Sequence, residues 1–376
     1  MSRRTRFPSR LLLGASLAAA GLFVSAPVLS AGIPTAGESP IRLSSNENAF
    51  GFSPKALEAM KAALESGNYY NFNNIGDMLA TAASKEGVPA DYIVLTAGSG
   101  PVLEMTAAAY AKEGKNVVTA APGYPQLTGA FARFGGTIKY TSVNAEKGID
   151  FGAMMRAIDD DTVIVYVCNP NNPTGVLADP AELRKFVISV PKDILVFVDE
   201  AYLELADNGL APNTMAPLTK LRKNLIVSRT FSKAYGMAGL RAGYGVGSPE
   251  VLEKIKKFYQ GPPSYLGAIA ATEAMKDTEY MESNRKNYIA VRNMVCAEFD
   301  RMGIAYSKPQ GAFVLFDSTI DSATFQEKMK DEGILVSRPF GLGDETGYDT
   351  WVRVSFGTED QMQSFLGAMQ KILGKT

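Results

Sequence analysis

The stretch SRTFSKAYGMAGLR, residues 228–241, decides how the rest of the chain is interpreted. It follows an apolar run, LIV, and sets Lys233 among the hydroxyls of Thr230 and Ser232, with Arg241 eight residues after the lysine. A lysine amine becomes an effective nucleophile when its pKa is lowered or when a carbonyl captures it. Lysine, hydroxyls and arginine together indicate a socket for a phosphorylated aldehyde, and pyridoxal phosphate is the common cofactor of that kind. The alternative is an exposed lysine on a strand-to-helix turn.

Short β-branched runs alternate with helical patterns from about residue 91 onward. This alternation predicts an α/β fold with a mainly parallel sheet covered on both faces. Ligands in such sheets bind beyond the carboxyl ends of the strands. The expected strands of this sheet are 92–96, 116–120, 137–142, 163–168, 195–198 and 225–227. After the break Gly261-Pro262-Pro263, long helical stretches and three strand-like pieces predict a smaller α+β domain.

Composition excludes several function classes. The net charge of −1 over 376 residues gives no reason to expect nucleic acid binding. Histidine is absent from the sequence, which excludes Ser-His-Asp chemistry, Cys-His chemistry and histidine-ligated metals. Cys168 and Cys296 stand in no metal-binding or redox spacing, so we predict no metal site.

The first residues are typical of an export signal. Four arginines within the first ten residues precede an apolar run, 11–24, that is short for a membrane span, and small residues around 26–32 offer a cleavage site. The segment Ser2–Phe7 resembles a twin-arginine signal, and the general secretory route is the alternative. We therefore expect a signal peptide over residues 1–31 and a periplasmic or secreted protein without stable membrane insertion.

Three loops that follow predicted strands carry candidate ligand-binding residues. The turn at Ser99 and Gly100 lies before a helix, where free backbone N–H groups can hold a phosphate. Tyr124, between two prolines, can stack on a flat heterocycle, although it can equally be a packed loop residue. In the turn NPNNPTG, residues 169–175, Asn172 can donate a hydrogen bond to a phenolate oxygen.

Two charged residues belong to predicted apolar strands, one at a strand end and one within a strand. Each needs a partner of opposite charge. Asp199 follows an apolar strand, and a protonated pyridine nitrogen would satisfy its carboxylate. Tyr202, three residues later, can reach the ring oxygen of the same cofactor. Arg353 lies in the strand-like run WVRVS, where a substrate carboxylate or an internal acid would pair with it. A helix-capping role is the alternative for Asp199.

Taken together, these motifs resemble the fold-type I pyridoxal-phosphate aminotransferases, most closely the histidinol-phosphate aminotransferase branch, from about residue 40 to 375. The resemblance implies that Lys233 binds the cofactor covalently and shuttles the proton. It assigns Asp199 to the pyridine nitrogen and Tyr124 to ring stacking. The implied ring-oxygen ligands are Asn172 and Tyr202, the implied phosphate ligands are Ser99, Gly100, Thr230, Ser232 and Arg241, and the implied substrate-binding residues are Arg353, Asn48 and Arg338.

The resemblance also implies a homodimer with shared active sites, in which Tyr70 reaches the neighbour's phosphate, with Tyr69 as the alternative. The expected domains are an N-terminal arm contributing to the small domain (32–64), a large cofactor domain (65–262) and a small C-terminal domain (263–376). The chain departs from the branch at Gly100-Pro101, where an acidic pair is usual. The loop after residue 68 also lacks the usual tyrosine-proline pattern.

We therefore predict transamination between an amino acid, or a histidinol-phosphate-like amine, and a 2-oxo acid. Export separates the chain from cytoplasmic histidine synthesis, so we expect a free amino acid as substrate, aromatic or basic. One alternative is a lyase, decarboxylase or racemase reaction with the same cofactor. The other is an exported protein that binds its ligand without turnover.

Overall fold

The structure, a computed structural model, describes residues 40–343 and 345–375. Its centre is a seven-stranded sheet in the order β2-β8-β7-β6-β5-β3-β4. Strand β8 runs in the direction opposite to the other six strands of this sheet. The α/β class with a mainly parallel sheet is thereby confirmed. The strands are β2 (Ile93–Thr96), β3 (Asn116–Ala121), β4 (Thr137–Ser142), β5 (Thr162–Cys168), β6 (Leu195–Asp199), β7 (Leu225–Thr230) and β8 (Gly243–Gly247).

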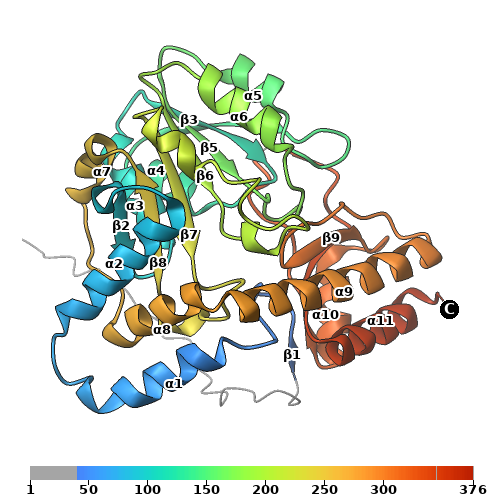
Figure 1. The fold of residues 1–376 in the computed structure, drawn as a ribbon. Helices are drawn as coiled ribbons and strands as arrows, with labels where there is room; N and C mark the ends of the chain where they lie inside the picture. Colours follow the sequence, from blue (N-terminus) through green and yellow to red (C-terminus); the bar gives the residue numbers. More distant parts are fainter. Residues whose placement is uncertain (1–39, 344, 376) are drawn as a thin grey trace, which may run out of the picture. The chain divides into compact units, whose positions relative to one another are not determined.

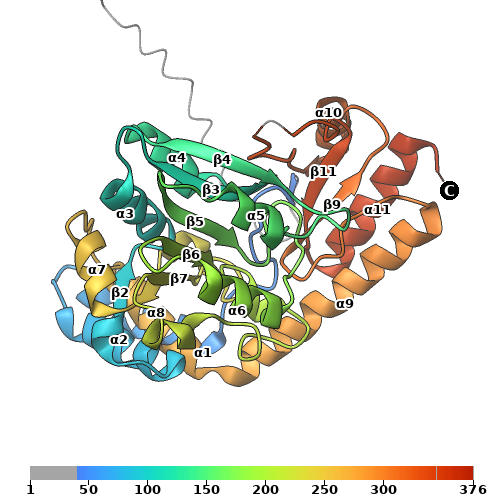
Figure 2. The same cartoon turned by 90° about the horizontal axis from the view of Figure 1, so that it is seen from above.

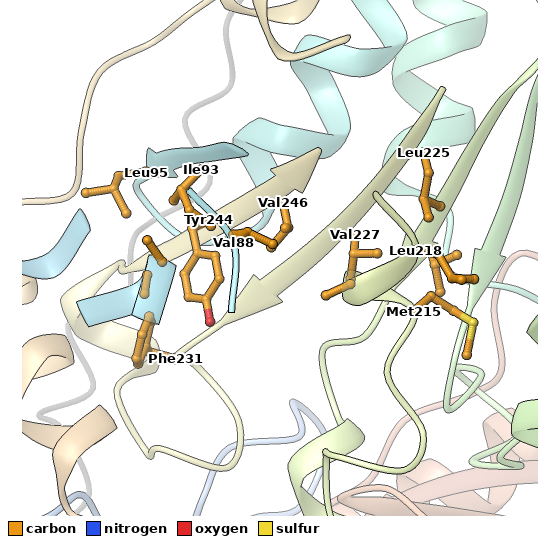
Figure 3. Close-up of a cluster of buried hydrophobic side chains, with 14 of the residues drawn as sticks. Val88, Ile93, Leu95, Met215, Leu218, Leu225, Val227, Phe231, Tyr244 and Val246 are labelled. Carbon is orange, nitrogen blue, oxygen red and sulfur yellow. The ribbon is translucent and has the colours of Figure 1, made fainter. Parts of the chain in front are cut away.

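Both faces of this sheet are apolar, because alternate residues of one strand belong to different buried clusters. Val198 and Val227 pack in one cluster, while Phe197 and Ile226 pack in another on the opposite face. Figure 3 shows part of the first cluster, in which Val227, Tyr244 and Val246 extend from β7 and β8. A sheet that is apolar on both faces requires helices on both faces.

Helices supply those two covers. One face packs against α3 (Gly100–Tyr110), α4 (Gln126–Arg133) and α7 (Pro249–Lys256). The other face packs against α2 (Phe72–Glu86), α5 (Phe151–Ala157), α6 (Pro180–Ser189) and α8 (Tyr265–Lys276). Helix α1 (Pro54–Ala63) lies beside α8, as Figure 1 shows. At the start of helix α1 the Ser53 side chain accepts from the Ala56 N–H, and Pro54 lies in the first turn, where its missing N–H is not needed.

A second buried cluster surrounds a smaller sheet. Strands β9 (Phe313–Asp317) and β11 (Trp351–Ser355) pair antiparallel and pack with α9 (Thr278–Met302), α10 (Ser322–Asp331) and α11 (Glu359–Leu373). Figures 1 and 2 both show the long helix α9 running from α8 to this smaller sheet. The N-terminal arm reaches the same region, because β1 (Ile41–Arg42) pairs parallel with β10 (Ile334–Leu335).

Three elements differ from the sequence prediction. The Asn-rich segment 68–74 was expected to be a loop, but α2 begins at Phe72 within it. Strand β8 was not predicted because it alternates glycine with Tyr244 and Val246, a composition with low strand propensity. Its glycines are required by close packing, since a Cβ on Gly243 would lie 2.5 Å from the backbone carbon of Gly98. Helix α10 was also not predicted.

Two of the expectations about chain organisation stay predictions. The signal peptide, residues 1–31, lies outside the described residues. The predicted boundary at residue 262 between a large and a small domain also stays a prediction. The seven-stranded sheet and the sheet of β9 and β11 pack in different buried clusters. Within residues 40–343 and 345–375, no helix combines the length and apolarity that a membrane crossing requires.

Candidate active site

A cavity of about 290 Å³ lies where several strands of the large sheet end. Cys168, Asp199 and Thr230 are the last residues of β5, β6 and β7, and all three line it. Adjacent parallel strands end at one edge of the sheet, so residues far apart in sequence meet there. The lining residues are Ser45, Asn46, Ser99, Gly100, Tyr124, Gln126, Cys168, Asn172, Asp199, Ala201, Tyr202, Thr230, Ser232, Lys233, Ala238, Arg241, Phe340 and Arg353.

Asp199 forms a buried acidic end of the cavity and is 2 % exposed. Its carboxylate accepts hydrogen bonds from the Ser228 hydroxyl at 2.7 Å and the Tyr166 hydroxyl at 3.5 Å. Burial raises the pKa of Asp199 to about 6, although both hydroxyls act in the opposite direction. No ion pair to this carboxylate occurs within the described parts of the chain. A buried carboxylate of this kind favours a cationic ligand group.

Tyr202 offers its phenol oxygen between two asparagines. Asn46 Nδ2 and Asn172 Nδ2 both donate to it, at 3.0 and 3.1 Å. Asn46 has a left-handed backbone, φ 54°, which asparagine tolerates better than most residues. Its side chain is fixed by Ser355, whose hydroxyl donates to Asn46 Oδ1 at 2.9 Å. The N-terminal arm therefore supplies one wall of the cavity.

Lys233 reaches the cavity from the loop after β7. Its Nζ donates to the carbonyl of Ser45 at 3.2 Å. Burial, with the positive charges of Arg353 and Arg241, lowers the pKa of Lys233 from 10.5 to about 8. A substantial fraction of this amine is therefore neutral near pH 8, which is the form that attacks a carbonyl.

Hydroxyls, backbone N–H groups and Arg241 gather at the α3 end of the cavity. Arg241 Nη1 donates to the Ser232 hydroxyl at 3.2 Å. Gly98 makes room for this guanidinium, since a Cβ there would lie 2.5 Å from Arg241 Nη2. At the start of α3, Pro101 has no N–H and the Val102 and Leu103 N–H groups donate to the Ser99 carbonyl, so Gly100 supplies the backbone N–H that can face a ligand. This set of donors suits an anion with several oxygens.

Arg353 is buried at another wall of the cavity. Its Nη1 donates to Asn172 Oδ1 at 2.8 Å and its Nη2 donates to the Ser44 carbonyl at 2.5 Å. The Nε atom is buried without a hydrogen-bond partner, and no carboxylate pairs with Arg353 in the described chain. Burial lowers the pKa of this guanidinium. A guanidinium so placed lacks the anion that it normally binds in a protein interior.

The cavity brings together eleven of the predicted site residues, and three lie elsewhere. Tyr70 is 93 % exposed. Asn48 donates to the Ala234 carbonyl at 3.0 Å and does not line the cavity. Arg338 is exposed, and its Nε donates to the Ser322 hydroxyl at 3.1 Å. The roles predicted for these three residues stay predictions.

Several lining residues were not predicted. Asn46 lines the cavity, whereas the prediction named Asn48, two residues later. The run SSNEN, residues 44–48, contains both asparagines, and its sequence does not show which of them faces the cavity. Gln126 is the first residue of α4, and no motif in the sequence marks it as a cavity residue. Phe340 lies in a loop with no regular pattern, and its ring lies 5.0 Å from the Arg353 guanidinium.

Comparisons with known proteins agree with this geometry. The family model "Aminotransferase class I and II" matches residues 38–369. A histidinol-phosphate aminotransferase of Moorella thermoacetica is 34 % identical over 335 residues, covering 89 % of this chain and 85 % of the relative. The histidinol-phosphate aminotransferase 2 of Pseudomonas aeruginosa is 34 % identical over 337 residues, covering 89 % of each. The solved histidinol-phosphate aminotransferase of Sinorhizobium meliloti, in complex with pyridoxal-5'-phosphate, has the same fold (TM-score 0.81, 24 % identity, 94 % of this chain and 99 % of that one).

The fold and the matches define the class of protein, a pyridoxal-phosphate-dependent transaminase. The chain belongs to the class I and II aminotransferase family. The predicted family, cofactor and reaction type are thereby confirmed.

Proposed function

We propose that the cavity is the transamination site and that Lys233 is its catalytic residue. The observation that carries this proposal is that the Lys233 amine, with its pKa lowered to about 8, shares one cavity with the unpaired carboxylate of Asp199. A neutral amine is needed to capture the aldehyde of pyridoxal phosphate, and an unpaired carboxylate is needed beside its pyridine nitrogen.

The rest of the cavity fits this cofactor. Arg241, Thr230, Ser232, Ser99 and Gly100 would hold the phosphate. The Gly98 position supports that assignment, because a side chain there would displace Arg241. The ring would lie against Tyr124, with its nitrogen at Asp199 and its oxygen beside the residue pair Asn172 and Tyr202.

The bound cofactor supplies an electron sink that stabilises negative charge at the substrate Cα. The chain's own residues then do three things. Asp199, held by Ser228, keeps a positive charge on the ring nitrogen. Lys233 Nζ would take the proton from the substrate Cα and hold it beside the reacting atoms. Burial of the cavity walls limits water around the amine.

Arg353 is the proposed site for the substrate carboxylate. Its buried Nε lacks a partner, and an arginine grips a carboxylate through parallel hydrogen bonds. We therefore propose an α-amino acid as the amino donor and a 2-oxo acid as the acceptor. Histidinol phosphate, which names the curated relatives, is the second candidate because those relatives are 34 % identical over most of the chain.

Export is a further part of the proposal. The arginines and the apolar run before residue 31 support a signal peptide of the twin-arginine type and a periplasmic or secreted enzyme. Cleavage would be seen as a mature N-terminus near residue 31 when the full chain is expressed in a bacterium with that export route. Retention of the intact N-terminus in the cytoplasm would contradict export.

We also propose a homodimer in which Tyr70 completes the neighbour's phosphate site. An exposed apolar segment supports a covering partner: Tyr69 is 72 % exposed, Phe72 is 70 % exposed and Leu64 is 63 % exposed. The test mixes two inactive variants, Tyr70→Ala and Lys233→Ala. Hybrid dimers would contain one intact site and regain activity, whereas no recovery after mixing would refute shared sites.

The visible absorption spectrum of the purified mature protein tests the main proposal. We expect a band of the bound cofactor that disappears when suitable amino acids are added and returns with a 2-oxo acid. Loss of carbon dioxide or an altered substrate configuration without that cycle would favour a decarboxylase or racemase. Faster turnover of histidinol phosphate than of every free amino acid would establish the second candidate.

A further inference from the structure

Gln126 bridges two residues at the edge of the cavity. It is the first residue of α4, and its Oε1 accepts a hydrogen bond from the Tyr124 hydroxyl at 3.0 Å. Its Nε2 donates to Glu104 Oε1 at 3.2 Å. Glu104 lies on α3, one turn after Gly100. The three side chains form a line from the helix α3 to the aromatic wall of the cavity.

The direction of these hydrogen bonds is set by Glu104. The Gln126 amide nitrogen faces the carboxylate, because it donates to Glu104 Oε1 and a carboxylate oxygen accepts. The amide oxygen then faces Tyr124, which must donate its phenol proton. Burial raises the pKa of Tyr124 to about 12, which agrees with a hydroxyl that keeps its proton.

Gly100 provides the space for this arrangement. A Cβ on Gly100 would lie 2.6 Å from Gln126 Nε2 and 3.3 Å from its Cδ. Gly100 has no positive φ angle, so a side chain there would act by displacing the Gln126 amide and not by straining the backbone. The histidinol-phosphate aminotransferase branch usually has an acidic pair where this chain has Gly100-Pro101. In this chain the Gln126 amide occupies the space that a side chain at residue 100 would take.

We propose that Gln126 is a positioning residue for transamination: held by Glu104, it fixes the Tyr124 hydroxyl and thereby the orientation of the Tyr124 ring against the cofactor. The inference rests on the proposed role of Tyr124 as the stacking residue. A ring tethered at its hydroxyl cannot tilt away from a stacked partner without breaking the hydrogen bond. The absence of a side chain at Gly100 lets the Gln126 amide lie where it holds the Tyr124 hydroxyl.

Three variants of the cofactor-loaded enzyme test this inference: Gln126→Met, Tyr124→Phe and the double variant. Methionine keeps the side-chain volume and removes both hydrogen bonds. For Gln126→Met we expect a weaker visible circular dichroism of the bound cofactor, about 3- to 10-fold weaker cofactor binding and a lower kcat with little change in KM. The double variant should equal Tyr124→Phe alone, because the tether acts only through the hydroxyl.

The control is Gln363→Met, since Gln363 Nε2 donates to Glu359 at 3.1 Å on α11, outside the cavity. It should leave all three measurements unchanged. A Gln126→Met enzyme with wild-type dichroism and cofactor affinity would overturn the inference, as would additive losses in the double variant. If the wild-type protein binds no pyridoxal phosphate, the proposed function fails first and the inference fails with it.

Discussion

The guanidinium of Arg241 occupies the space where a side chain on Gly98 would stand, with only 2.5 Å between Arg241 Nη2 and the position of such a Cβ. Gly98 also has a φ of +92°, which favours glycine. Two independent constraints therefore select glycine at this position, and one of them is the geometry of the proposed phosphate site.

Replacement of Gly98 by alanine should therefore weaken cofactor binding. The methyl group would push Arg241 away from Ser232 and strain the turn before α3. We expect the Kd for pyridoxal phosphate to rise at least about 10-fold, the loss of one charge-assisted contact. Gly239→Ala is the control, because a Cβ at Gly239 meets no atom within 4 Å. Equal affinities of the two variants would contradict this account of the phosphate site.

Asp199 should lower the stability of the cofactor-free protein at neutral pH. Its pKa in the fold is about 6, above the ordinary 3.8, so the folded state binds a proton more tightly than the unfolded state does. The unfolding free energy therefore falls as the pH rises from about 4 to 6, by about 3 kcal/mol. Asp199→Asn should recover up to this amount at pH 8 and almost none at pH 4.

Urea unfolding of the cofactor-free proteins measures this gain. The same Asp199→Asn variant should bind pyridoxal phosphate more weakly and transaminate more slowly, because the ring nitrogen loses its anionic partner. A control is Asp331→Asn at the exposed end of α10. A less stable Asp199→Asn protein at pH 8 would show that the carboxylate is satisfied in the fold.

Cofactor capture should follow the ionisation of Lys233. Below its pKa of about 8 the amine is mostly protonated, so the capture rate should rise about tenfold per pH unit and level off above pH 8. The rate at which the visible band appears after pyridoxal phosphate is added gives this profile. Lys233→Ala should give no such band, whereas Lys223→Ala, on the surface, should behave as wild type. A rate that still rises at pH 10 would contradict the lowered pKa.

The two predicted substrate arginines should respond differently to lysine substitution. Arg353 is buried in the cavity wall with a free Nε, and a lysine there loses the fork that grips a carboxylate. We expect Arg353→Lys to raise KM for the amino acid about 10- to 100-fold while cofactor binding changes little. Arg338→Lys should leave KM unchanged, because Arg338 is exposed outside the cavity. Equal effects would place Arg338 in the substrate site as well.

The sequence predicted much of this cavity because strand ends can be read from apolar runs. Cys168, Asp199 and Thr230 end neighbouring parallel strands, so the polar residues beyond them had to lie close together. The two adjacent acids at the end of β6 have different surroundings. Asp199 lines the cavity, whereas Glu200 pairs with Arg229 Nη1 at 2.5 Å.

Other parts of the site depend on contacts that no local pattern encodes. Asn46 reaches Tyr202 because Ser355, far away in the chain, holds it. Gln126 enters the cavity because Gly100 leaves space on a different helix. Strand β8 was missed because its glycines are required by packing against Gly98 and Val102, which only the assembled fold reveals.

The N-terminal arm gives the site an order of assembly. Asn46 is held by Ser355 across 309 positions of the chain, and the carbonyls of Ser44 and Ser45 accept from Arg353 and Lys233. The N-terminal arm is synthesised early, but it can take its place in the cavity wall only after β11 has been synthesised. Such long-range closure is slow relative to local folding. The complete pocket therefore cannot form before β11 has been synthesised, so cofactor capture in the finished geometry follows synthesis of Arg353 and Ser355.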